Sequence, residues 1–150
     1  ELVFDQGLGD LFVIRVAGNI TDESVTGSVE YAVAVLGCEL VVVLGHTDCG
    51  AVKATLEEFS QPSENLSPNL GFIVNAISPV VSSLTSNDSN LNQDELLNHA
   101  IRANIQHSAR QLYATSTILE SAVNDGKLII AGAEYHLKTG EVDFFDQIPE

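Results

Sequence analysis

The sequence LVVVLGHTDCG, residues 40–50, decides how this chain folds. Its first five residues are apolar without alternation, which is typical of a strand buried on both faces in a parallel sheet. Gly45 ends the apolar run, and His46 and Cys49 follow it directly. Because ligands of open α/β sheets bind beyond the carboxyl ends of the strands, we expect a functional turn here.

His46 and Cys49 are the candidate metal ligands of this turn. A thiolate and a neutral imidazole are typical zinc ligands, and a spacing of three residues lets both side chains converge. Two ligands do not by themselves make a site, however. A buried structural cysteine beside a hydrogen-bonded histidine explains the same pattern, and the spacing leaves both interpretations open.

Cys38 is the other cysteine of the chain, but it precedes the strand that His46 follows. At about 3.3 Å per extended residue, the two side chains lie roughly 15–20 Å apart. We therefore expect Cys38 to be a core residue and not a third ligand.

Further strands and helices are predicted on both sides of this stretch. Residues 11–16 and 128–132 are short apolar runs that predict buried strands, the first interrupted by Arg15, and residues 141–145 predict an edge strand. Apolar spacing of three and four predicts helices, of which the first is capped by Asp22 or Ser24 and followed by Gly37. Pro79 is expected to kink or break the third helix. The expected helices cover approximately residues 24–36, 51–59, 70–84, 94–113 and 117–123.

Strands that alternate with helices predict an α/β fold. Right-handed crossovers give a mainly parallel β-sheet flanked by helices on both faces. With 150 residues, 45% of them hydrophobic, the chain suits a single domain over residues 1–150.

Composition excludes several classes of function. The net charge of −15 repels phosphate backbones, so this acidic protein is not expected to bind nucleic acid. We identify no apolar run long enough to span a membrane and no signal peptide. Two cysteines are too few for a disulfide scaffold, which favours a reducing compartment, the cytoplasm or an organelle interior.

Three ordered segments resemble the β-class carbonic anhydrases over essentially the full chain. The first is FDQGLGDLFVIRVAGN, residues 4–19. The second runs from SVEYAV, residues 28–33, to LGHTDCGAV, residues 44–52, and the third is GKLIIAGAEYHLKTGEV, residues 126–142. The resemblance implies a β-carbonic-anhydrase-like fold and zinc held by His46 and Cys49. It also implies reversible hydration of carbon dioxide to bicarbonate and a proton by zinc-bound hydroxide.

The resemblance further implies a substrate pocket to which Phe12, Ala17 and Tyr31 contribute. Two interpretations of Arg15 remain open. It forms a structural ion pair, or it contacts bicarbonate together with Tyr135, as in family members that bind bicarbonate away from zinc. The family works as homodimers or larger assemblies, with pockets completed across subunits, so we expect a homo-oligomer.

One departure from the family pattern concerns the start of the chain. The family places another zinc-binding cysteine, within a Cys-x-Asp-x-Arg motif, just before the segment that opens here at Glu1. The Asp–Arg pair that acts on zinc-bound water and the first strand of the sheet are expected with it, and the chain is expected to be N-terminally incomplete. The alternative is a truncated or degenerate anhydrase-like domain without catalysis, which acts as an interaction or assembly module.

Overall fold

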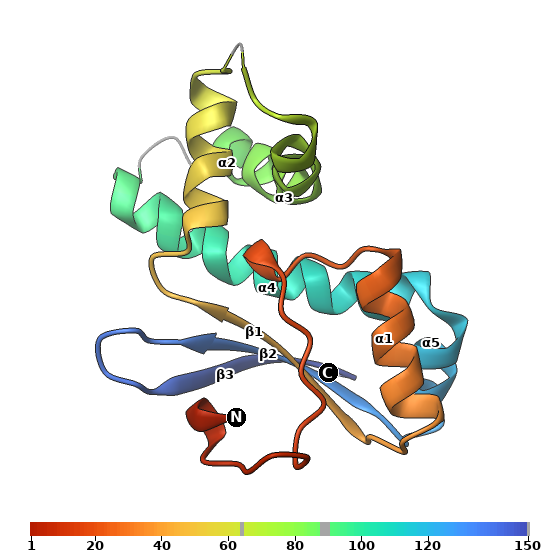
Figure 1. Ribbon diagram of the computed structural model, residues 1–150. Helices are drawn as coiled ribbons and strands as arrows, with labels where there is room; N and C mark the ends of the chain where they lie inside the picture. Colours follow the sequence, from red (N-terminus) through yellow and green to blue (C-terminus); the bar gives the residue numbers. More distant parts are fainter. Residues whose placement is uncertain (64, 88–90, 150) are drawn as a thin grey trace.

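The computed structural model describes residues 1–63, 65–87 and 91–149 (Figure 1). Two short 3-10 helices come first, and five α-helices and three strands follow. In chain order they are η1 (Leu2–Phe4), η2 (Ala17–Asn19), α1 (Glu23–Ala34), β1 (Leu40–His46), α2 (Gly50–Ser60), α3 (Pro68–Asn87), α4 (Gln93–Thr115), α5 (Thr117–Asn124), β2 (Ile129–Tyr135) and β3 (Val142–Ile148).

The strands form one sheet in the order β1-β2-β3. β1 and β2 are parallel, with Leu40 opposite Ile129 and His46 opposite Tyr135. β3 pairs antiparallel with β2 and forms the predicted edge strand, with an irregularity at Gly132 and Ala133. The predicted α/β fold is confirmed, and the parallel register places the carboxyl ends of β1 and β2 side by side.

The core lies between the sheet and α4, which crosses one face of it (Figure 1). Ile105 of α4 is fully buried and lies against two glycines of the sheet. A Cβ atom built on Gly45 would lie 2.5 Å from Ile105 Cδ1, and one on Gly132 would lie 3.2 Å from Ile105 Cγ2. Glycine therefore lets α4 approach the end of β1 and the middle of β2 closely.

The expectation of helices on both faces is wrong for the described residues. In Figure 1 the α-helices lie above the sheet, and the first residues of the chain lie below it. On that second face Leu40, Ile129 and Phe144 are about half exposed, and the Phe144 ring lies beside the ring of Phe4, with centroids 6.5 Å apart. The reason is topological, because every helix between β1 and β2 belongs to one crossover and lies on one side.

Residues 11–16 do not form the buried strand that their composition predicts. They are extended but exposed, and within the described part of the chain the backbone of residues 11–15 pairs with no strand. A strand needs a hydrogen-bonding neighbour, and an apolar run alone does not supply one.

The helix predictions agree better with the structure. Asp22 is the N-cap of α1 and accepts a hydrogen bond from Val25 N at 2.8 Å, and Gly37 has a φ of 74°. Pro79 lies inside α3, which continues through it to Asn87, so the expected break is absent.

Candidate metal site

The turn between β1 and α2 is fixed to the end of β2. Thr47 N donates to the Tyr135 carbonyl at 3.0 Å, and Leu137 N donates to Thr47 Oγ1 at 3.1 Å. Asp48 has a φ of 58°, a left-handed conformation that Asp adopts more readily than most residues. These contacts turn the chain sharply enough for α2 to begin at Gly50.

His46 ends β1 and is half-buried. Its Nδ1 atom lies 2.8 Å from the carbonyl oxygen of Thr47. A carbonyl oxygen can only accept, so Nδ1 carries the proton of the neutral ring and the lone pair of Nε2 is free. Zinc-binding histidines are held in this manner by an acceptor on their second nitrogen. Sequence reasoning missed this acceptor because a backbone carbonyl has no sequence signal.

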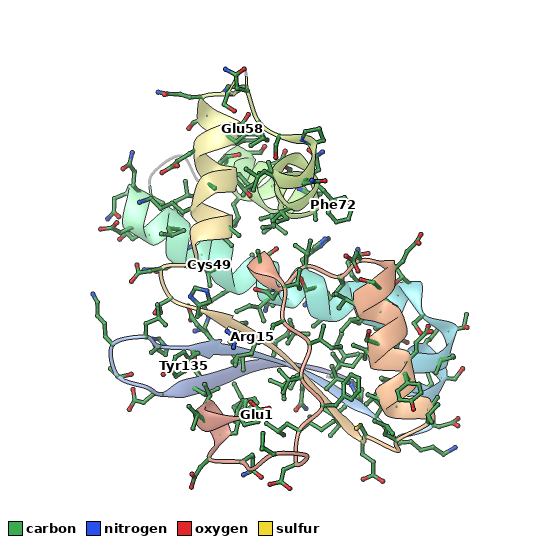
Figure 2. The ribbon with its side chains drawn as sticks, in the orientation of Figure 1. Glu1, Arg15, Cys49, Glu58, Phe72 and Tyr135 are labelled. Atoms are coloured by element: carbon green, nitrogen blue, oxygen red, sulfur yellow. The ribbon has the colours of Figure 1, made fainter. Side chains whose placement is uncertain are left out.

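Cys49 is 3% exposed and is the N-cap residue of α2 (Figure 2). The amino end of a helix is a favourable position for an anionic sulfur ligand. One imidazole with a free Nε2 and one thiol at a helix start are donors that fit zinc. They are half of a site, because no group of three or more metal-binding side chains occurs among the described residues.

Cys38 lies at the opposite end of β1, as predicted. It precedes Leu40 and is a free, half-buried cysteine, less buried than a core residue. It lines a shallow hollow with residues of α1 and α5. The distance along the strand therefore excludes it from the His46–Cys49 turn.

The three predicted pocket residues separate into two places. Phe12 and Tyr31 contact each other, with ring centroids 6.5 Å apart, and are 46% and 51% exposed. Tyr31 lies in the second half of α1, which leads to the amino end of β1, whereas His46 lies at the carboxyl end. A strand of seven residues spans roughly 20 Å, so within one chain this aromatic pair does not reach the turn.

Ala17 begins the short helix η2, which lies beside the turn. A Cβ atom built on Gly18 would lie 3.1 Å from the Ala51 Cβ atom, and one on Gly45 would lie 3.2 Å from Asn19 Oδ1. Ala51 and Gly45 flank the two candidate ligands in sequence. Ala17 is therefore the predicted pocket residue that lies near them.

Arg15 and Tyr135 were predicted as a bicarbonate contact. In the view of Figure 2, Arg15 lies between Cys49 and Tyr135. Within the described chain Arg15 makes no ion pair, so a structural ion pair does not explain it. Tyr135 is opposite His46 in the parallel register and is half-buried.

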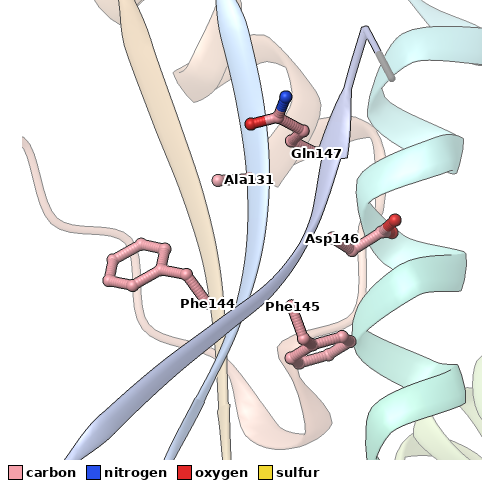
Figure 3. A pocket seen from close by; sticks show the side chains of 5 residues that line it. All are labelled: Ala131, Phe144, Phe145, Asp146 and Gln147. Atoms are coloured by element: carbon pink, nitrogen blue, oxygen red, sulfur yellow. The ribbon is translucent and has the colours of Figure 1, made fainter.

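Other features of the structure lie outside this region. His99 is exposed on α4, and burial lowers the pKa of His107 on the same helix. The hollow in Figure 3, lined by Ala131, Phe144, Phe145, Asp146 and Gln147, contains none of the predicted site residues. No α-helix of the described residues is long and apolar enough to cross a membrane.

The family model and the most similar relatives that we compared with this chain are all described as carbonic anhydrases. A family model described as "Carbonic anhydrase" matches residues 1–142. The "Carbonic anhydrase" of Mycolicibacterium smegmatis is 41% identical over 146 residues, which cover 95% of this chain and 66% of that protein. "Carbonic anhydrase 2" of Mycobacterium tuberculosis is 37% identical over 150 residues, covering 99% and 69%. The chain thus spans about two thirds of the length of these relatives.

Solved structures show the same fold. The β-carbonic anhydrase CcaA superposes with a TM-score of 0.84 at 29% identity, over 97% of this chain and 72% of that one. One of two β-carbonic anhydrases from Sordaria macrospora, described as tetrameric, gives a TM-score of 0.82 at 21% identity, over 96% and 72%. At that identity the second likeness supports the fold alone.

Proposed function

The chain belongs to the β-class carbonic anhydrase family, and from that premise we propose that His46 and Cys49 are two of its zinc ligands. The general reaction of the family is the reversible hydration of carbon dioxide to bicarbonate and a proton, and the family is generally zinc dependent. We propose the same substrate pair and the same metal for this protein.

The hydrogen bond from His46 Nδ1 to the Thr47 carbonyl is the observation that carries the proposal. It fixes the tautomer and presents Nε2 as a donor at the end of a buried strand. Cys49, buried at the first turn of α2, supplies the second donor from three residues further on.

The remaining groups are proposed to come from residues outside 1–150. The resemblance implies a further cysteine ligand and an Asp–Arg pair just before Glu1. The share of the relatives that this chain spans, about two thirds, leaves room for them. With a third protein ligand, zinc keeps one position open and supplies Lewis-acid activation of water near neutral pH.

The described residues have defined roles around that centre. The Thr47 carbonyl orients the His46 ring, and the contacts of Thr47 with Tyr135 and Leu137 hold the turn in place. Ala17 forms part of the wall beside the ligands. A small apolar wall suits carbon dioxide, which is linear and carries no net charge.

We propose that Phe12 and Tyr31 complete the pocket of a second copy of the chain. They form an exposed aromatic pair remote from their own turn. Further exposed apolar side chains occur on residues 11–16 and at the start of β1, and exposed apolar side chains in such numbers are typical of an interface. The expected assembly is a homodimer or a larger homo-oligomer with shared pockets.

Arg15 and Tyr135 are proposed to contact bicarbonate. Arg15 is the cation of the N-terminal segment, and within the described residues its guanidinium group has no partner. A guanidinium group offers paired donors that match a planar oxyanion.

Zinc analysis and stopped-flow hydration of carbon dioxide test the proposed function. The encoded full-length protein, purified without chelator, is expected to hold about one zinc ion per chain and to hydrate carbon dioxide. Metal-free protein without hydration activity would overturn the enzyme assignment and favour an assembly module. Full activity after substitution of both His46 and Cys49 would overturn the ligand assignment.

A further inference from the structure

Asn104 is a polar residue in the most buried part of α4. It is 1% exposed and lies beside Ile101 and Ile105, both of which are fully buried. Its Nδ2 atom donates to the carbonyl oxygen of Gly18 at 2.8 Å, across 86 residues of sequence. A buried amide is costly unless its hydrogen bonds are made, so this contact explains a polar side chain in the core.

The acceptor belongs to a turn that is poorly held by its own backbone. Gly18 and Asn19 have consecutive positive φ values of 68° and 44°. The local hydrogen bond, Asn19 N to the Val16 carbonyl, is long at 3.4 Å. The conformation of Ala17–Asn19 therefore depends on contacts with other elements.

Those contacts join the turn to both candidate ligands. Gly18 lies against Ala51, two residues after Cys49, and Asn19 Oδ1 lies against Gly45, which precedes His46. Ile77 of α3 also packs against Gly18, since a Cβ atom built on Gly18 would lie 2.7 Å from the Cδ1 atom of Ile77. The turn is thus packed between the first turn of α2 and the end of β1.

We propose that Asn104 is a positioning residue for the active site. It holds Gly18, and through it sets the distance of Ala17 from the ligand pair His46 and Cys49. Ser108, one helical turn further along α4, provides a weaker second contact, with Asn19 Nδ2 at 3.4 Å from its Oγ. This inference rests on the proposed function, because the position of Ala17 affects the rate only if carbon dioxide binds beside it.

The test compares Asn104→Asp with Ser108→Ala in the full-length, zinc-loaded protein. Asn104→Asp keeps the size of the side chain but replaces the donor with an oxygen that repels the Gly18 carbonyl. We expect kcat/KM for hydration to fall roughly tenfold or more, because small displacements of a pocket wall are costly. Zinc content and the pH midpoint of activity are expected to stay unchanged. Ser108→Ala, which removes only the weaker contact, is expected to reduce kcat/KM by less.

Hydrogen exchange supplies a readout that does not depend on activity. Amides of residues 16–20 are expected to exchange faster in Asn104→Asp, while those of β1 keep their protection. Val123→Ala in α5 is the matched control, because it removes buried volume away from the turn. Its kcat/KM and its exchange at residues 16–20 are expected to match those of the wild type.

Three outcomes would overturn the proposal. The first is an Asn104→Asp variant whose kcat/KM and whose amide exchange at residues 16–20 equal those of the wild type. The second is a Val123→Ala variant that changes both quantities as much as Asn104→Asp does. The third is loss of zinc in parallel with activity, which would mean that Asn104 supports the ligands themselves. An inactive, zinc-free wild type would instead overturn the proposed function, and the exchange data would still decide whether Asn104 fixes the turn.

Discussion

The Nδ1 atom of His46 lies 2.8 Å from the carbonyl oxygen of Thr47, the next residue in the chain. The Thr47 amide in turn donates to the Tyr135 carbonyl, so the imidazole orientation depends on the pairing of two strand ends. Orientation of a ligand by its second nitrogen raises metal affinity, commonly by tenfold to a hundredfold. Loss of the ligand itself is expected to lower the zinc affinity by more than loss of its orienting hydrogen bond does.

Substitution of His46 by Gln is therefore expected to abolish stoichiometric zinc binding in the full-length protein. The amide lacks the free ring nitrogen, and the described residues contain no group of three or more metal-binding side chains that could hold the ion in its place. Zinc per chain, measured by elemental analysis after dialysis, is the readout. His99→Gln, at an exposed position on α4, is the control and is expected to keep its zinc. Equal zinc contents in the two variants would remove His46 from the site.

Gly45 and Gly27 are expected to respond to alanine in opposite directions. A Cβ atom on Gly45 would lie 2.5 Å from Ile105 Cδ1 and 2.6 Å from Ile105 Cγ1, so Gly45→Ala overpacks the core and is expected to cost about 1–3 kcal/mol. Gly27 lies in α1 with nothing within 4 Å of its Cβ position, so Gly27→Ala is expected to stabilise by about 0.5–1 kcal/mol.

Urea unfolding of both variants measures these changes. A double variant, Gly45→Ala with Ile105→Ala, removes both clashing atoms, Cδ1 and Cγ1, so Gly45→Ala is expected to cost less in the Ile105→Ala background than in the wild type. If Gly45→Ala were as stable as the wild type, the close approach of α4 to the end of β1 would be wrong.

The sequence predicted the features that depend on local patterns. The unbroken apolar run before Gly45 identified β1, and the spacing of Leu97, Ile101 and Ile105 identified α4. Asp22, the N-cap of α1, was one of the two caps predicted, with Ser24 as the other. In each case the physical cause is local, namely hydrophobic periodicity or a side chain that bonds to a nearby amide.

The features that depend on distant partners were not predicted. Residues 11–16 have the composition of a strand, but strand formation needs a neighbour that composition does not specify. Asn104 is 86 residues from Gly18, and nothing in either residue type indicates that they pair. The separation of Phe12 and Tyr31 from His46 likewise follows from the direction of α1 relative to β1.

Arg102 is expected to stabilise the sheet through Glu134. Its Nη1 atom lies 3.1 Å from Glu134 Oε2, which is nearly fully buried, and 2.8 Å from the exposed Asp143 Oδ2. Arg102→Met would leave Glu134 without its cation, at an expected cost of about 2–4 kcal/mol. Asp143→Asn removes an exposed charge and is expected to cost under about 1 kcal/mol.

Chemical denaturation at pH 7 distinguishes these two changes. The double variant Arg102→Met with Glu134→Met removes both partners of the ion pair and is expected to recover most of the stability. A single Arg102→Met variant that unfolds at the wild-type urea concentration would show that Glu134 does not depend on Arg102.

Acidification is expected to weaken the cap of α1. The Val25 amide, followed by the Ser24 hydroxyl, lowers the pKa of Asp22 below its ordinary value of 3.8. A carboxyl group whose pKa is lower in the folded state stabilises the fold above its ordinary pKa and loses that contribution as the pH falls through the folded pKa. Asp22→Ala is therefore expected to cost about 1 kcal/mol at pH 7 and less at pH 3.

The comparison with Asp22→Asn isolates the charge, because Asn keeps a capping oxygen that does not titrate. The difference in unfolding free energy between Asp22→Asn and Asp22→Ala is expected to be the same at pH 7 and pH 3. The difference between the wild type and Asp22→Ala is expected to shrink over the same interval. If that second difference stayed constant, the Asp22 carboxylate would not be the charged group that caps α1.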